Sequence, residues 1–207
     1  MTRSLAVAAG VAVLAVPSTA SAAELTVSPE KRCYSSGESV NLLGTGFTPL
    51  DSATVTRDGT VLRPLPTDAN GAFNGLLTFA QDRGRETRTY MATDGTNSSL
   101  TASTQVTVTA VRVGLKPANG APGRVMTITA RGFATGPTLW AHVTHRKSTR
   151  NLKLGRLSGA CGGLRTRKRL LPADAALGVH KIQFDTFRRY NPKQPVRDRF
   201  DITVSSG

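Results

Sequence analysis

Apolar and polar residues alternate along most of the chain after residue 23, most clearly in segments 39–44 and 125–131. A period of two places successive side chains on opposite faces of a β-strand. No stretch long enough for a structural helix shows a convincing apolar period of about 3.6 residues. Segment 172–177, closed by Gly178, predicts one or two helical turns at most. The pattern therefore predicts an all-β protein.

Short strands separated by turn signals are expected in both halves of the chain. Asp58-Gly59 is typical of a two-residue hairpin turn, and Asn70-Gly71 marks another. Seven short strands per half are typical of an immunoglobulin-like β-sandwich. The expected strands are 24–28, 39–44, 52–57, 61–64, 71–79, 87–93 and 105–109 in the first half, and 112–116, 125–131, 138–145, 152–157, 163–170, 179–185 and 199–204 in the second.

The two halves repeat one pattern. Gly37–Phe47 matches Gly123–Phe133 at an offset of 86, and each segment opens at a turn glycine and closes in Gly-Phe. A second match pairs Gly71–Leu76 with Gly159–Leu164 at an offset of 88. Ordered matches of this kind indicate two copies of one domain in tandem. We expect no flexible linker between them.

The N-terminus predicts export. Residues 5–16 form an unbroken apolar run after one positive charge, and Ala20-Ser21-Ala22 is a small-x-small cleavage site. The run is too short to span a bilayer, and no apolar tail follows at the C-terminus. We expect a signal peptide over residues 1–22, an immunoglobulin-like domain 1 over 23–110 and an immunoglobulin-like domain 2 over 111–207, in a soluble extracellular protein without a transmembrane anchor.

Charge divides unevenly between the halves. Residues 24–110 carry seven Lys and Arg against nine Asp and Glu, whereas residues 111–207 carry nineteen against four, an excess of fifteen positive charges. A strongly basic half indicates an anionic partner. Outside the cell this would be a cell-wall polymer, acidic polysaccharide, lipid headgroups or released nucleic acid, and no motif supports nucleic acid. The alternative is that arginine serves only solubility.

The strongest basic cluster predicts an anion-binding strand. Arg165, Arg167 and Arg169 would point one way, about 6.6 Å apart, and guanidinium groups bind phosphate or carboxylate through forked hydrogen bonds. Lys168 would then face inward, which favours an edge strand. Charge on an edge also prevents strand-on-strand aggregation, and this is the competing interpretation. The candidate anion-binding residues are these three arginines with Lys153, Arg156, Arg188 and Arg189.

Cys33 and Cys161 lie one in each half. In an oxidising compartment such a pair suggests a disulfide, here between the domains, worth about 4–5 kcal/mol by the chain-entropy argument. The alternative is two separate buried thiols, because the second repeat match aligns Cys161 with Phe73, a position expected in the core.

Signals for catalysis and metal binding are weak. His142 and His145 are three apart on one expected strand and so face opposite ways, which makes them a poor metal pair. The chain has no Gly-x-Ser-x-Gly nucleophile elbow. A hydrolase would need a polar cleft that holds one of these histidines or His180 beside a carboxylate. We expect no cofactor, no metal and no enzymatic activity.

Several runs resemble known sandwich families. The chain is similar to immunoglobulin-like repeats in secreted bacterial surface proteins, to IPT/TIG modules and to neocarzinostatin-like chromophore carriers at Val27-Ser28-Pro29, Gly37, Gly46–Pro49 and Thr67–Gly71. The resemblance implies a sandwich fold and an extracellular setting. The carriers hold two disulfides within one domain, unlike the single cysteine per half here.

Two functions follow from these expectations. The first is a secreted, non-catalytic binding or structural protein whose basic domain 2 contacts an anionic cell-surface polymer. The alternative is a small-molecule carrier or inhibitor protein with a pocket at the sandwich loops.

Overall fold

The computed structural model describes residues 22–118 and 121–205, so the predicted signal peptide lies outside the described residues except for Ala22. The described part contains fifteen strands. Over these two ranges there is no helix that is long and apolar enough to cross a membrane. Segment 172–177, where a helical turn was expected, instead contains a tight turn in which the Ala175 amide donates to the Pro172 carbonyl at 3.2 Å.

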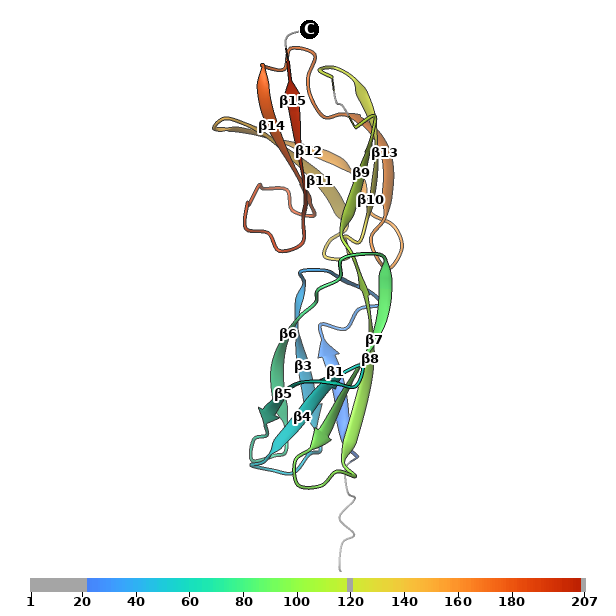
Figure 1. Cartoon of the computed structure of the whole chain (residues 1–207), viewed down its shortest axis with the longest axis vertical. Helices are drawn as coiled ribbons and strands as arrows, with labels where there is room; N and C mark the ends of the chain where they lie inside the picture. Colours follow the sequence, from blue (N-terminus) through green and yellow to red (C-terminus); the bar gives the residue numbers. More distant parts are fainter. Residues whose placement is uncertain (1–21, 119–120, 206–207) are drawn as a thin grey trace, which may run out of the picture.

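Two sheets enclose an N-terminal core and form the N-terminal sandwich (Figure 1). One sheet has the order β1-β3-β6 and the other β2-β8-β7-β4-β5; all neighbours are antiparallel except β2 and β8. The strands are β1 (Glu24–Ser28), β2 (Tyr34–Ser35), β3 (Ser39–Thr45), β4 (Ser52–Arg57), β5 (Thr60–Pro66), β6 (Phe73–Thr78), β7 (Arg85–Asp94) and β8 (Thr101–Thr109). Only β2, which is two residues long, was not expected from the alternation.

Two further sheets enclose a second core and form the C-terminal sandwich. Their orders are β13-β10-β9 and β12-β11-β14-β15, and all neighbours are antiparallel. The strands are β9 (Arg112–Lys116), β10 (Val125–Arg131), β11 (Thr138–His145), β12 (Ser148–Arg156), β13 (Leu164–Arg169), β14 (Gly178–Asp185) and β15 (Asp198–Val204). Three strands facing four, in this order, is an immunoglobulin-like sandwich.

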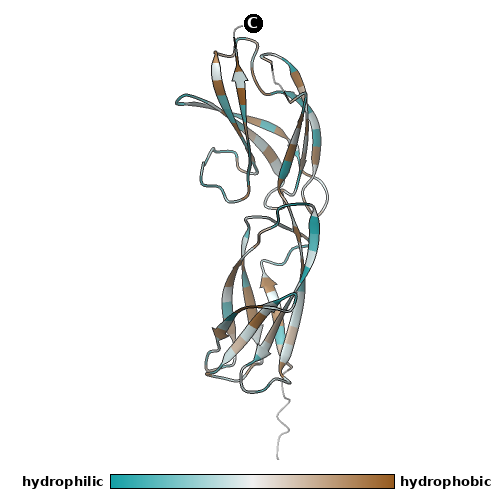
Figure 2. Ribbon diagram, in the orientation of Figure 1, coloured by the Kyte–Doolittle hydropathy of each residue, from teal (hydrophilic) through white to brown (hydrophobic). Residues whose placement is uncertain are grey.

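Burial follows the predicted alternation. Met126, Ile128 and Ala130 on β10 point into the C-terminal core, and the intervening side chains face outward. Figure 2 shows the same alternation of apolar and polar positions along many strands. Trp140, the single tryptophan, is half-buried on the outer face of its sheet and does not belong to the core cluster.

The turn before β6 and the turn before β13 correct the second repeat match. Gly71 has a φ of 72°, and a Cβ added there would lie 2.0 Å from the Phe47 carbonyl oxygen. Gly162 has a φ of 59°, and a Cβ added there would lie 2.1 Å from the Phe133 carbonyl oxygen. The amides of Phe47 and Phe133 donate to the carbonyls of these two glycines in turn. Gly71 therefore corresponds to Gly162, an offset of 91, and the expected match to Gly159 is wrong.

The position of Cys161 in the turn before β13 allows a disulfide with the N-terminal sandwich. Cys161 lies in the turn before β13, not at the core position that the earlier match gave it. It bonds to Cys33, with the two Cα atoms 5.1 Å apart, and so links the two sandwiches covalently. A disulfide of this kind is typical of proteins in oxidising compartments.

Noncovalent contacts surround the disulfide at the junction of the sandwiches. The Ala134 amide donates to the Ser35 hydroxyl at 2.8 Å, and the Arg112 guanidinium donates to the Asp82 carbonyl at 2.9 Å. Only residues 110 and 111 separate β8 from β9. The sandwiches consequently lie end to end in an elongated molecule (Figure 1).

Candidate anion-binding surfaces

The three predicted arginines lie together on an edge strand. Each faces a residue of β10 across the sheet: Arg165 is opposite Thr129, Arg167 opposite Thr127 and Arg169 opposite Val125. Because Met126 and Ile128 point inward, these pairs lie on the outer face. Lys168 is exposed, as an edge position allows.

The same outer face carries three cations that the sequence analysis did not include. We call it the ladder face, and its basic residues are Arg165, Arg167 and Arg169 on β13, Arg131 on β10, and Arg112 and Lys116 on β9. All six are exposed. The added residues occupy outward positions on β9 and β10, so alternation would have found them once the sheet order was known.

Thr127 and Thr129 occupy the middle strand of the ladder face. They separate the arginine row on β13 from Lys116 on β9 by two strand spacings, about 9.6 Å. Thr127 thus lies between Arg167 on β13 and Lys116 on β9, whereas the β9 neighbour of Thr129 is Gly114. The arginine row extends over about 13 Å, because β-strands rise about 3.3 Å per residue.

The positive charge of the ladder face is not neutralised within the protein. β9, β10 and β13 contain no Asp or Glu. Among the described residues, the Lys and Arg side chains of the C-terminal sandwich form no ion pair with a carboxylate. Arg131 and Arg112 are direct cross-strand partners, and such like-charged pairs disfavour folding. The face therefore concentrates positive charge at a cost to stability.

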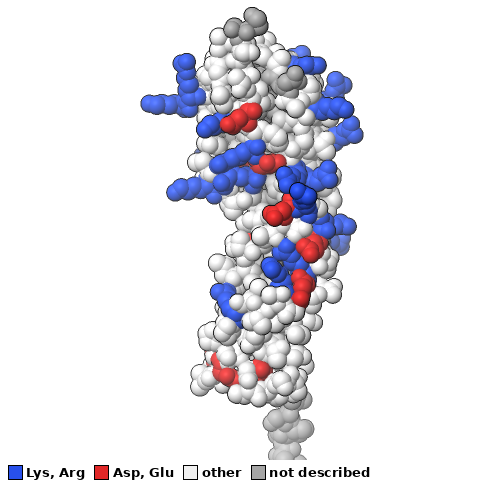
Figure 3. Space-filling view, viewed as in Figure 1, with Lys and Arg blue, Asp and Glu red and all other residues white. Residues whose placement is uncertain are grey.

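The equivalent face of the N-terminal sandwich has a different character. Its sheet β1-β3-β6 corresponds to β9-β10-β13, and the outward positions bear Thr26, Asn41, Leu43, Asn74 and other uncharged side chains, with Glu24 as the charged exception. The fold alone does not require a basic face at this place. Figure 3 accordingly shows basic side chains crowded on the C-terminal half of the molecule.

The remaining predicted anion-binding residues lie on the opposite layer. Lys153 on β12 is opposite Trp140, and Arg156 is opposite Thr138, both on the outer face of the four-stranded sheet. Arg188 and Arg189 belong to the segment 186–197 between β14 and β15, which packs against that outer face. The structure thus separates the candidates into two groups on different sides of the sandwich.

Segment 186–197 is held on the sheet by a buried polar network. The Gln183 side chain donates to the Asn191 carbonyl at 2.9 Å, and the Arg199 guanidinium donates to the Pro192 carbonyl and to the Gln183 side chain. The Phe187 amide donates to the Asp185 carboxylate at 2.8 Å. These bonds position the exposed side chains of Arg188, Arg189 and Lys193, which we call the loop surface.

His142 completes this network beneath the segment. One ring nitrogen is 3.1 Å from the Asp185 carboxylate, the other 2.7 Å from the Asn151 side-chain oxygen, and the ring of Tyr190 packs at 5.7 Å. Burial lowers the pKa of His142, but hydrogen bonds to Asp185 and Asn151 outweigh it, and the net pKa is raised.

His142 therefore does lie beside a carboxylate, that of Asp185, but the pair does not line a cleft. His142 and Asp185 are fully buried, so a substrate cannot reach either group in this conformation. His145 faces the other side of the sheet and stacks on His180, with ring centroids 4.4 Å apart. The part of the chain that the structure describes holds no cluster of three His, Cys, Asp or Glu residues able to bind a metal. The arrangement supports packing of the loop rather than hydrolysis.

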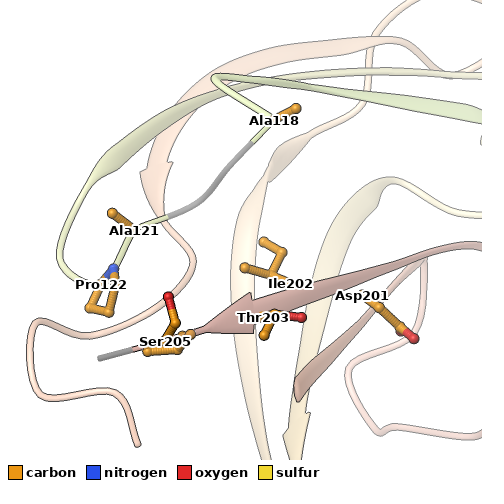
Figure 4. Close-up of a pocket in the computed structure, with 8 residues that line it drawn as sticks. Ala118, Ala121, Pro122, Asp201, Ile202, Thr203 and Ser205 are labelled. Atoms are coloured by element: carbon orange, nitrogen blue, oxygen red, sulfur yellow. The ribbon is translucent and has the colours of Figure 1, made fainter. Parts of the chain in front are cut away.

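Two hollows on the C-terminal sandwich bear on the carrier alternative. One, of about 360 Å³, lies beside the end of β15 and is lined by Ala118, Ala121, Pro122 and residues 201–205, which include Asp201 and Ile202 (Figure 4). The other, of about 180 Å³, lies between the loop and the sheet and includes Tyr190, Lys181 and Arg199. Neither is the deep apolar cleft that a carrier of apolar molecules would need.

Comparisons with known proteins give only distant likenesses. No protein-family model matches the chain, and no curated protein is significantly similar in sequence. Among solved structures, a tetra-tandem repeat in the extending region of a large adhesion protein is 14% identical, with a TM-score of 0.30, over 88% of this chain and 49% of that one. This chain thus spans about half of that structure.

Two further solved structures are similar at the same level. The polymeric Ig receptor ectodomain of a teleost fish is 13% identical, with a TM-score of 0.33, over 88% of this chain and 98% of that one. Red sea bream transglutaminase is 9% identical, with a TM-score of 0.30, over 90% of this chain and 32% of that one. Likeness at this level carries no information about what this chain binds, and the fold assignment rests on its own strand order.

Proposed function

We propose that this protein is a secreted, non-catalytic binding protein whose C-terminal sandwich contacts a linear anionic polymer at the cell surface through the ladder face. The observation that carries the proposal is a row of three arginines beside further cations on a face without a carboxylate. The N-terminal sandwich, which lacks such a face, acts as the spacer and partner domain. The disulfide between the sandwiches agrees with an extracellular location.

The ladder face favours a polymer over a small ligand. Its cations extend along β13 and across the three strands of the sheet. An extended chain of phosphate, sulfate or carboxylate groups can contact several guanidinium groups at once, each by forked hydrogen bonds. Release of counterions from the polymer adds a favourable contribution that depends on salt.

The proposal is tested by binding to isolated cell wall and to heparin over a salt series. We expect wild-type binding to weaken steeply as salt rises. The triple variant Arg165→Ala, Arg167→Ala, Arg169→Ala should bind more weakly and with a log–log salt slope smaller by about 2, because each lost contact to a single-stranded polyanion contributes about 0.7.

A matched variant separates the site from net charge. Arg32→Ala, Arg83→Ala, Arg85→Ala removes three charges from the N-terminal sandwich and should leave the slope near that of the wild type. Absence of wild-type binding at low salt would contradict the proposal. Equal losses in the two triple variants would also contradict it, because net charge alone would then explain binding.

A further inference from the structure

The two groups of cations on the C-terminal sandwich cannot serve one flat binding surface. The ladder face is the outer side of the sheet β13-β10-β9, whereas segment 186–197 packs against the outer side of the sheet β12-β11-β14-β15. Figure 3 shows basic side chains projecting from both flanks of this half of the molecule. The hydrophobic core lies between the two.

The distance between the ladder face and the loop surface weakens the interaction between their charges. Packed sheets lie about 10 Å apart, and a layer of side chains on each outer side brings the separation of the charged groups to roughly 20 Å. The Debye length at physiological ionic strength is about 8 Å. An anionic chain bound along one surface therefore leaves the charge of the other available.

Hydrogen bonds hold the backbone beneath the loop surface on the sheet. Segment 186–197 is a twelve-residue connection without strands, and long connections without secondary structure are usually functional or disordered. Asp185, Gln183 and Arg199 hold its backbone at three points. Its exposed cations meet an anion without first ordering the loop, which reduces the entropic cost of binding.

The loop surface also lacks acidic neighbours in its own segment. Residues 186–197 contain four Lys and Arg and no Asp or Glu. Asp185, which precedes the segment, is buried and accepts hydrogen bonds from Gln183 and Phe187, so its carboxylate is turned away from solvent. The segment itself therefore carries only positive charge, and Asp201 on β15 lines the hollow between the loop and the sheet.

From this separation we infer that one molecule binds two polyanion chains, one on the ladder face and one on the loop surface, and so cross-links them. The inference rests on the proposed function, since it assumes that both surfaces bind the same class of ligand. It adds that the protein bridges chains instead of coating a single one. Two binding surfaces on a rigid body convert weak single contacts into strong attachment to a multivalent polymer.

The test compares binding with cross-linking in the purified secreted protein. Long-chain polyphosphate is the cross-linking probe, followed by light scattering over a range of protein-to-polymer ratios. A heparin oligosaccharide labelled with a fluorophore reports binding to single chains. We expect wild-type scattering to rise, reach a maximum and fall again when excess protein saturates the chains, as bivalent bridging requires.

Two variants with equal charge changes give the decisive comparison. The ladder variant Arg165→Ala, Arg167→Ala, Arg169→Ala and the loop variant Arg188→Ala, Arg189→Ala, Lys193→Ala should each still bind the oligosaccharide. Each should lose the scattering maximum by tenfold or more. The variant Arg32→Ala, Arg83→Ala, Arg85→Ala should keep it, and unchanged circular dichroism and melting temperatures show that all three fold.

The outcomes separate this inference from the proposed function. Binding that persists while the loop variant scatters like the wild type would overturn the bridging role and leave polymer binding by the ladder face intact. A wild type that binds without a scattering maximum, with affinity reduced in both variants, would mean that one chain wraps both surfaces, which also overturns it. A wild type that binds neither probe at low salt would remove both proposals.

Discussion

Single carboxylates can organise whole loops in this fold, and Asp94 at the end of β7 is the clearest case. Its buried side chain accepts hydrogen bonds from the Thr48 amide at 2.7 Å, the Thr48 hydroxyl at 3.0 Å and the Asn97 amide at 2.9 Å. Burial raises the pKa of Asp94, but these bonds outweigh it and lower the pKa to about 2. The ionised carboxylate therefore ties two loops of the N-terminal sandwich together.

Replacing Asp94 by Asn should destabilise the N-terminal sandwich by about 2–3 kcal/mol at pH 7, because an amide group would face donors that now meet a charged acceptor. The pKa of Asp94 is about 2 in the folded state against an ordinary 3.8. A lowered pKa stabilises the protein above the ordinary value, and this contribution is lost as pH falls from about 4 towards 2. Urea unfolding at several pH values should show that decline in the wild type and a flatter profile in the variant.

The exposed carboxylate of Asp82 provides the control. Asp82→Asn changes the charge equally and should leave the free energy of unfolding within about 0.5 kcal/mol of the wild type. Similar losses in both variants would refute the role given to Asp94.

At the scale of elements, the turn before β13 determines where that strand begins. Gly162→Ala would place a Cβ 2.1 Å from the Phe133 carbonyl oxygen at a φ of 59°, whereas Gly159 has a φ of 71° with nothing within 4 Å. Gly159→Ala should therefore cost only the backbone strain, about 1–2 kcal/mol. Gly162→Ala should cost clearly more, since backbone atoms must also move. Thermal unfolding of the two variants measures the difference. A larger loss of stability in Gly159→Ala than in Gly162→Ala would contradict the correspondence of Gly71 with Gly162.

Strand positions were largely predictable from sequence, because one buried and one solvated face impose a period of two on each strand. The turn before β13 was not predictable. Residues 71–76 and 159–164 both read Gly-Ala-x-x-Gly-Leu, but the sequence does not show that Gly162, and not Gly159, lies beneath the carbonyl of a phenylalanine. The arginine row followed from alternation within β13 alone. The placement of Arg188 and Arg189 on the other layer depended on sheet order and on the bonds from Asp185 and Gln183, neither of which alternation reveals.

At the scale of the whole molecule, the Cys33–Cys161 disulfide holds the two sandwiches in one orientation. Interfaces between domains of one chain permit relative motion by default, and two hydrogen bonds, Ala134 to Ser35 and Arg112 to Asp82, accompany the disulfide here. The double variant Cys33→Ser, Cys161→Ser should still fold into both sandwiches. Its free energy of unfolding should be lower by up to about 5 kcal/mol, which is the chain-entropy value for the 128-residue separation of the two cysteines.

Calorimetry and small-angle X-ray scattering measure these two effects. The melting temperature of the double variant should fall, and its scattering should indicate a broader range of overall dimensions. Wild-type protein treated with a reductant should behave in the same way as the variant. Identical melting and scattering with and without the disulfide would show that the noncovalent junction alone fixes the orientation.

The position of the disulfide also defines a mechanical path through the molecule. If the two ends of the chain were pulled apart, tension would pass from β1 through the sulfur–sulfur bond directly to the turn before β13. The chain between the cysteines, which includes β2 to β12, would bear no load and could not be extended. Extension would be confined to the residues before Cys33 and to those after Cys161, which include β13, β14 and β15, so β2 to β12 would stay within a closed covalent loop.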